Sequence, residues 1–437
     1  MKSSAVVLHL SLGVLLGFAA AAPPEAQAEI RASSKRSLGS KVNGVKGGSC
    51  NKGRCRISGG QRAGKNLFHR FRDFDTRGAI RDVRFQTGKA KNLFVGVTSP
   101  LGSFIDKRIA LSSKANLFWL SPGGMVLGSG ADFVNTPQLR LSTASKLNFY
   151  AGQFDVFSSS ADDLALLRGE PLTGALGLQA KPQLESDAGL LPGIHLNGIN
   201  ISIDDDLLIN APGGQVAIEN STLSLSSEEG VGGTLEVTGE QIAIDGNSQL
   251  LAKGPEGGGL IQVGGSWQNS DPSVRQSVKA TVESGAVLDA SATNHGDGGE
   301  IVVWSDITNP ESVTSVAGAL LVEAGIAGGD GGRIETSGAD LDIAGIDVST
   351  FSEKGENGLW LLDPTDYIIG EDASTAIESA LEGGNDVTVL VSGGNCDASY
   401  ATSSCTIGTP SGGGLTTAAG GGGDDRIKVD WPVDANT

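Results

Sequence analysis

The sequence predicts an all-β fold, a right-handed parallel β-helix (a solenoid) with an N-terminal cap. Three observations predict it: a glycine content of 65 among 437 residues, an aromatic content of 5%, and short alternating apolar runs separated by Gly-Gly corners. Glycine at about twice its usual share suits a chain with many tight corners, and the lack of a G-x-y period excludes collagen. Helical exceptions are expected around residues 162–167 and 374–381, where Ala, Leu and Glu favour helix.

A Gly-Gly corner followed by alternating apolar positions recurs five times. The corners are Gly213-Gly214, Gly232-Gly233, Gly258-Gly259, Gly298-Gly299 and Gly331-Gly332. Alternation with period two predicts strands with one buried face. The spacing between corners varies, as a solenoid allows, because loops at its corners project outward. A β-sandwich is the alternative, but its strands are usually longer and joined by hairpin turns.

The first 28 residues have the pattern of a secretory signal peptide. Lys2 precedes an apolar run from Ala5 to Ala22, and Ala26-Gln27-Ala28 is typical of a cleavage site. We expect residues 29–190 to form an N-terminal domain with the cap, and residues 191–437 to continue the repeats. No C-terminal cap is visible in the sequence, which predicts a truncated chain, because the end of a solenoid needs a cap.

The net charge of −18 hides a strong asymmetry along the chain. Residues 29–114 carry 20 Lys and Arg against 5 Asp and Glu, whereas residues 115–437 carry 11 against 44. A basic head on an acidic body indicates a docking segment for an acidic partner or an anionic lipid surface, with solvated surface charge as the alternative. Nucleic acid is not expected as a partner, because no nucleic-acid-binding motif is present.

The four cysteines form two close pairs in the sequence, Cys50 with Cys55 and Cys396 with Cys405. In an oxidising compartment each pair can close a local disulfide. A metal site is the alternative, but no histidine lies near either pair in the sequence.

Several motifs occur in an order that matches a known family. They are Asn66-Leu67-Phe68-His69-Arg70-Phe71, Ala115-Asn116-Leu117-Phe118-Trp119-Leu120 with Ser121-Pro122-Gly123-Gly124-Met125, the stretch Gly298 to Ser305, and Gly358-Leu359-Trp360-Leu361-Leu362-Asp363-Pro364. On these motifs the chain resembles the secretion domain of two-partner-secretion exoproteins, the filamentous-haemagglutinin or haemagglutination-activity family. Ser121 and Gly123 replace the two Asn of the family's N-P-N-G-I turn, and the upstream N-P-N-L turn has no match near Val97 to Ile109.

The resemblance implies export across a bacterial outer membrane by a barrel transporter whose periplasmic domains recognise the chain. Residues 29–190 would then be the secretion domain. The residues implied in recognition are Asn66, Leu67, Phe68, His69, Phe71, Asn116, Ser121, Pro122, Gly123, Gly124 and Met125. Because family members act mostly as adhesins, we expect a secreted or surface-bound adhesin with an unknown receptor or glycan. The head of a toxin-delivery fibre is an alternative.

A polysaccharide-active enzyme is the other alternative, because β-helices also host such enzymes. Asp204-Asp205-Asp206 is the best candidate for a carboxylate cluster, but its place between two apolar residues favours a solvated corner. After signal cleavage the histidines are His69, His195 and His295, too scattered in sequence to suggest a triad or a metal cluster. We therefore expect no catalytic residue, metal or cofactor.

Overall fold

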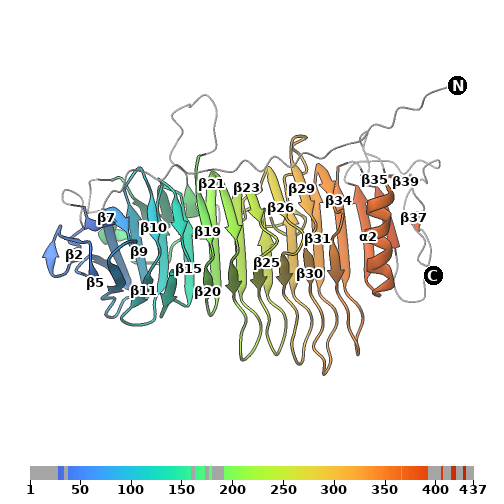
Figure 1. Cartoon of the computed structure of the whole chain (residues 1–437), viewed down its shortest axis with the longest axis horizontal. Coiled ribbons are helices and arrows are strands. Elements are labelled where there is room, and N and C mark those ends of the chain that lie inside the picture. Colours follow the sequence, from blue (N-terminus) through green and yellow to red (C-terminus); the bar gives the residue numbers. More distant parts are fainter. Residues whose placement is uncertain are drawn as a thin grey trace.

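The computed structural model describes residues 28–33, 38–158, 163–172, 177–179, 191–365 and 367–391, and three strands beyond them at 405–406, 415–419 and 427–429. Nearly all regular structure in these residues is β-strand, so the all-β prediction is confirmed. The strands form one elongated array, from β2 near one end to helix α2 near the other (Figure 1). The predicted signal peptide lies outside the described residues, except for residue 28.

The body of the array repeats a unit of three short strands. One unit holds β28 (Glu300–Trp304), β29 (Val313–Val316) and β30 (Ala319–Leu321), and the next holds β31 (Arg333–Gly338), β32 (Asp340–Asp342) and β33 (Asp347–Ser349). Each strand pairs in parallel with its counterpart in the next unit, for example Ile301 with Ile334 and Leu320 with Val348. This parallel pairing between units differs from the antiparallel pairing of a sandwich.

The paired strands form three rows along the array. The first row contains β7 (Asn66–Asp75), β9 (Asn92–Val97), β12 (Asn116–Leu120), β15 (Gln138–Ser142), β21 (Asp206–Glu219), β23 (Thr234–Ile244), β25 (Leu260–Val263), β28, β31, β34 (Leu359–Pro364) and β36 (Asp386–Val391). The second row contains β10 (Ser103–Ile105), β13 (Met125–Leu127), β19 (Leu191–Asn197), the later parts of β21 and β23, β26 (Lys279–Val282), β29 and β32. The third row contains β5 (Gly53–Ser58), β8 (Ile80–Phe85), β11 (Arg108–Leu111) and β14 (Asp132–Val134), and then β20 (Asn200–Ser202), β22 (Thr222–Ser224), β24 (Gln249–Leu251), β27 (Val287–Asp289), β30 and β33.

One continuous line of apolar side chains runs through the core beneath the first row. Its members occupy equivalent positions in successive strands and are all fully buried: Leu67, Leu93, Leu117, Leu139, Leu207, Leu235, Ile261, Ile301, Ile334, Trp360 and Val387. Their neighbours along each strand point to the outer face, as the predicted alternation requires. Burying each such side chain stabilises the fold by about 1.5–3 kcal/mol relative to its exposed state.

The N-terminal end of the array is covered by short antiparallel strands. They are β1 (Ile30–Ala32), β2 (Lys41–Val42), β3 (Val45–Lys46), β4 (Ser49–Cys50) and β6 (Gln61–Ala63). Strands β1 and β6 pair with β7, and β2 pairs with β5. They therefore occupy the free edges of the first strands, which is what an N-terminal cap must do.

Helix α2 (Glu371–Glu382) lies near one end of the array (Figure 1) and contacts β33, the last strand of the third row. Ile377 and Leu381 on the helix are buried in the main core. The side chain of Asn385 accepts hydrogen bonds from the Thr350 amide (2.6 Å) and hydroxyl (2.8 Å). The predicted helix at 374–381 is thus confirmed, and it covers an edge where the sequence alone shows no cap.

Further strands follow at that end: β35 (Tyr367–Ile369), β37 (Cys405–Thr406), β38 (Leu415–Ala419) and β39 (Ile427–Val429). The second helical exception is the short 3-10 helix η1 (Asp163–Leu166), within the predicted stretch 162–167. In the part of the chain that the structure describes, no helix is long and apolar enough to cross a membrane.

Candidate functional site

Three strands of the first row begin with the same tripeptide, Asn-Leu-Phe. Strands β7, β9 and β12 pair in register, so Asn66, Asn92 and Asn116 are adjacent, as are the three Phe residues two positions later. Parallel in-register strands place like side chains directly above one another. The first and third copies belong to the motifs that carry the family resemblance. The middle copy, at residues 92–94, is a repeat of the same tripeptide that those motifs do not include.

The three phenylalanines form a stacked ladder on the outer face of the array. The ring centroids of Phe68 and Phe94 are 4.7 Å apart, and those of Phe94 and Phe118 are 4.6 Å apart. All three are buried, because they belong to a second apolar cluster separate from the main core. The rest of this cluster includes Phe149 and Phe154, which come from a later part of the chain.

We call that later part the covering segment, residues 143–179 as far as the structure describes them. It holds β16 (Lys146–Phe149), β17 (Gly152–Asp155), η1 and β18 (Leu178–Gln179). Strand β16 pairs in antiparallel fashion with both β17 and β18, outside the three rows. The chain leaves the array after β15, covers the phenylalanine ladder, and re-enters the array at β19.

An asparagine ladder lies beside the phenylalanine ladder. The Asn92 amide donates to the Asn66 Oδ1 atom at 3.0 Å, and the Asn116 amide donates to Asn92 Oδ1 at 3.1 Å. The same ladder binds the covering segment, because Asn66 donates to the Leu167 carbonyl at 2.8 Å and Asn92 to Glu170 Oε2 at 2.8 Å. Buried amides bonded in this way hold the covering segment in one register.

His69 and Arg70 are also buried in the array. His69 Nδ1 lies 2.9 Å from the Ser40 hydroxyl. Burial, with repulsion from Arg62, lowers the pKa of His69 to about 3, so the ring is neutral at physiological pH. Arg70 donates to the Ser158 carbonyl at 2.8 Å and the Asp155 carbonyl at 2.7 Å, both in the covering segment. In the folded chain these two residues therefore have structural roles.

The predicted turn at residues 121–125 is held by a chain of hydroxyl bonds. The Ser121 hydroxyl donates to the Gly124 carbonyl at 2.8 Å, and the Ser103 hydroxyl donates to Ser121 Oγ at 2.9 Å. The indole of Trp119 donates to Ser103 Oγ at 3.1 Å. The serine that replaces the family's asparagine thus still bonds across the turn.

A second Ser-Pro turn lies against the first one. Residues 99–102 form it, and the Gly102 amide donates to the Ser99 carbonyl at 3.1 Å. The two turns touch so closely that a Cβ atom on Gly123 would lie 2.3 Å from the Ser99 carbonyl oxygen. The sequence near Val97 to Ile109 has no N-P-N-L motif, and the turn at residues 99–102 is built instead on Pro100 and Gly102.

None of the eleven residues implied in recognition is exposed in the folded chain. Eight are buried: Asn66, Leu67, Phe68, His69, Phe71, Ser121, Gly124 and Met125. Three are half-buried: Asn116, Pro122 and Gly123. A partner of the folded chain would have little access to them.

Exposed basic residues gather where the Asn-Leu-Phe strands begin. Lys65 directly precedes β7, Lys89 and Lys91 lie on the turn before β9, and Lys114 lies on the turn before β12. All four are exposed, and Lys114 pairs with Asp204 at 3.0 Å. We call these four lysines the basic corner.

Other basic residues of the head are partly neutralised. On the third row, Arg54 pairs with Asp82 at 2.8 Å, and Arg108 pairs with Asp132 at 2.9 Å. Asp82 is also 3.3 Å from Arg84. The basic corner is therefore one of the parts of the head that present exposed basic side chains, another being Lys41, Lys46 and Lys52 in the cap.

The predicted disulfide between Cys50 and Cys55 is present, with the two Cα atoms 5.8 Å apart. It joins the end of β4 to β5 within the N-terminal cap. Cys396 and the side chain of Cys405 lie outside the described residues, so that pairing stays a prediction.

The residues considered for catalysis do not come together. Asp204 and Asp205 are exposed at a corner, and Asp206 begins β21 at 3.8 Å from Arg140. His69 is buried in β7, whereas His195 lies on β19, 3.0 Å from Glu219. Among the described residues, no three His, Cys, Asp or Glu side chains are grouped as a metal site would require.

Comparisons with known proteins agree with the motifs. The family described as TPS secretion domain matches residues 37–297, more than half of the chain. The crystal structure of the HMW1 secretion domain from Haemophilus influenzae is similar at 16% sequence identity, over 71% of this chain and 95% of that chain, with a TM-score of 0.29, too low to carry an argument. Among curated proteins none matches. The chain belongs to the family of TPS secretion domains and carries the secretion domain of a two-partner-secretion exoprotein.

Proposed function

We propose that the chain is a non-enzymatic adhesin, exported through an outer-membrane barrel transporter and folded outside the cell as a right-handed parallel β-helix. Membership of the TPS secretion domain family supports export and a cognate transporter. The three-strand units, each paired in parallel with the next, support the β-helix. In such a solenoid every unit contacts only its neighbours, so the chain can fold unit by unit as it emerges.

The observation that carries the proposal is the burial of the Asn-Leu-Phe residues under the covering segment. Phe68, Phe94 and Phe118 are accessible only while residues 143–179 have not yet packed against them. The covering segment follows β12 in the chain, so a partner that meets the chain from its N-terminus encounters the three copies first. We propose that the transporter's periplasmic domains bind this apolar stretch in the unfolded chain, and that folding outside hides it.

The basic corner would add electrostatic attraction to the binding between this stretch and the transporter. Lys65 and Lys91 each directly precede an Asn-Leu-Phe copy, so charge and apolar contact are adjacent even in the extended chain. An acidic surface on the transporter would steer such a segment and would lose its effect as salt rises.

A first experiment compares two sets of corner glycines. Replacing Pro122, Gly123 and Gly124 with bulky β-branched residues should stop secretion and weaken binding to the transporter's periplasmic domains in a pull-down, because Pro and Gly favour this turn even before the array has folded. The matched control changes residues 257–259 in the same way. Both sets lie at tight corners, since a Cβ on Gly258 would be 1.8 Å from the Ala290 carbonyl oxygen. Both variants should therefore fold poorly, and equal binding by both would refute recognition at the turn.

A second experiment tests the charge without disturbing the core. Lys65→Glu with Lys91→Glu should weaken the pull-down strongly at low salt, and secretion should fall with it. The control is Lys279→Glu with Lys354→Glu, which changes the net charge equally at two exposed lysines of the acidic body. If the two doubles bind and secrete alike, the basic corner is only solvated surface.

A further inference from the structure

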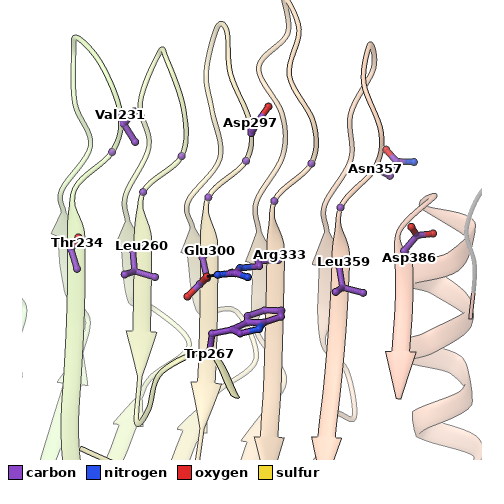
Figure 2. A pocket seen from close by; sticks show the side chains of 18 residues that line it. Val231, Thr234, Leu260, Trp267, Asp297, Glu300, Arg333, Asn357, Leu359 and Asp386 are labelled. Carbon is purple, nitrogen blue, oxygen red and sulfur yellow. Dashed lines mark hydrogen bonds and ion pairs between the residues drawn. The ribbon is translucent and has the colours of Figure 1, made fainter. Parts of the chain in front are cut away.

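A groove of about 790 Å³ runs along the body, across strands β23, β25, β28, β31, β34 and β36. Figure 2 shows it with its labelled residues on successive strands. It lies far along the chain from the Asn-Leu-Phe strands, and the export proposed above makes no use of it.

Bare backbone forms one side of the groove. Gly232 and the Gly-Gly corners at 258–259, 298–299 and 331–332 line it with residues that have no side chain. Close packing within the array requires glycine there, because a Cβ on Gly298 would lie 1.9 Å from the Val322 carbonyl oxygen. The fold alone therefore accounts for these glycines, so a binding site would depend on the side chains at the other side of the groove.

The other side is a row of outward side chains in register. Its members, one from each strand, are Thr234, Leu260, Glu300, Arg333, Leu359 and Asp386. None of the six is buried. Glu300 and Arg333 form an ion pair, with apolar side chains on the strands before and after them (Figure 2). Polar hydrogen-bonding groups thus alternate with exposed apolar surface.

An aromatic ring is held against this row by a loop from elsewhere. Trp267 lies on residues 264–278, between β25 and β26, and the Arg333 guanidinium sits 4.3 Å from its ring centroid (Figure 2). The next residue, Gln268, has a φ of 46°, a conformation uncommon outside glycine. Its backbone N–H donates to Glu335 Oε2 at 2.7 Å, which ties the loop to the outer face of β31. The half-exposed tryptophan is therefore fixed in position.

From this arrangement we infer that the groove binds a neutral, hydroxyl-rich polysaccharide chain. The exposed part of the Trp267 ring, with Leu260 and Leu359, offers apolar surface for the C–H faces of sugar rings. The carboxylates of Glu300 and Asp297 and the guanidinium of Arg333 offer planar groups that hydrogen-bond to hydroxyls. The glycine corners let a ring approach the backbone closely.

An extended peptide is a poorer occupant. It would need free backbone donors, but the corner glycine amides donate within the array: Gly258 to the Asp297 carbonyl, Gly298 to Asp330 and Gly331 to Glu356. A polyanionic chain is disfavoured by the body's own charge, 44 acidic against 11 basic residues from residue 115 onward. A neutral glycan meets neither obstacle.

The test uses the full secreted chain and defined hexasaccharides. Cellohexaose, maltohexaose, mannohexaose and N-acetylchitohexaose are titrated by calorimetry, with hexagalacturonate and hexalysine as the charged probes. At least one neutral hexasaccharide should bind, and Trp267→Ala should weaken its binding by about tenfold or more, the loss expected on truncating a central aromatic anchor. Tyr150→Ala, at a 94%-exposed aromatic outside the groove, should leave the affinity unchanged.

A second variant, Leu359→Arg, fills the groove without touching Trp267 and should also weaken binding. Each variant's thermal unfolding is measured, so that loss of fold is not mistaken for loss of a site. The inference is overturned if no neutral hexasaccharide binds, if Trp267→Ala and Leu359→Arg bind like the native chain, or if only a charged probe binds. This inference rests on the proposed adhesive role, for which the groove would be the binding surface. If the purified protein bound no hexasaccharide, the secretion experiments above would be unaffected. If the secretion experiments failed, the measured glycan binding would likewise be unaffected.

Discussion

The units at residues 66–142 and those at residues 234–364 share one core and differ on their outer face. In both regions the first row carries the same line of buried Leu, Ile or Trp residues. On the outer face, the N-terminal units carry Phe68, Phe94 and Phe118, hidden by the covering segment. The later units carry three polar or acidic side chains and two apolar ones at that position: Glu236, Gln262, Val302, Glu335 and Leu361.

The two regions show that inward and outward positions of the strands serve different purposes. Inward positions determine that units stack, and they vary little because every unit must fill the same space. Outward positions are free of that demand, so one region can carry an apolar ladder and another a polar groove. Since each unit contacts mainly its neighbours, a change in one region should have little effect on the other.

The largest effect is expected from Phe94→Ala, at the centre of the ladder. It removes a fully buried ring that stacks on two others and should cost about 3–5 kcal/mol. Hydrogen exchange should show faster exchange in β7, β9, β12 and the covering segment, while β28 to β34 stay protected.

The matched control is Phe351→Ala, at a phenylalanine that is 46% exposed. It should change stability by about 0.5 kcal/mol or less. Loss of protection throughout the array after Phe94→Ala would contradict the independence of the two regions.

A smaller effect is expected from Asn92→Ala. It leaves the Asn66 carbonyl oxygen and the Asn116 amide without their buried partner and frees Glu170. A buried polar group without a partner costs about 1–3 kcal/mol. Chemical denaturation should report that loss in the N-terminal region.

Asn247→Ala removes a similar bond from the body, where the amide of Asn247 donates to Asn220 Oδ1 at 3.1 Å on the exposed surface. Water can replace that bond, so the change should be about 0.5 kcal/mol or less. Equal losses of stability from Asn92→Ala and Asn247→Ala would mean that burial of the asparagine ladder adds nothing to the free energy of unfolding.

Much of the core could be predicted from the sequence, because alternation and Gly-Gly corners are local signals. The Cys50–Cys55 bond and the helix at 374–381 were equally local. The run of apolar residues from Leu117 to Leu120 also carries a signal, since continuous apolar residues indicate a strand buried on both faces.

What covers the second face could not be predicted from that signal. The side chain that covers Phe94 from the later part of the chain is Phe149, and the guanidinium that packs on the Trp267 ring belongs to Arg333. Neither pairing has a spacing or a motif that identifies it. The turn at residues 99–102 was missed for another reason: the family's asparagines were sought, whereas the backbone needs only Pro and Gly.

The body also contains a buried ionisable residue, Glu335. Glu335 is buried under the loop 264–278, where it accepts hydrogen bonds from the Gln268 amide and, at 3.0 Å, from the Ser337 hydroxyl. Burial raises the pKa of Glu335 to about 8, against the opposing effect of these two bonds and with added repulsion from Asp363 and Glu300.

This buried carboxyl predicts a pH dependence that arises in the body. The unfolded chain releases the Glu335 proton near its ordinary pKa of 4.5, and the folded chain retains it to about 8. Stability from this group is complete below pH 4.5 and falls as the pH rises to about 8, because over that range only the folded state still binds the proton. Glu335→Gln cannot titrate, so its melting temperature should fall less between pH 5 and pH 9 than that of the native chain. Glu283→Gln, at an exposed position, should keep the native slope. Phe94→Ala should also keep the native slope while lowering every value, because it acts on the other region. A native slope in Glu335→Gln would show that this carboxyl is charged in the folded chain.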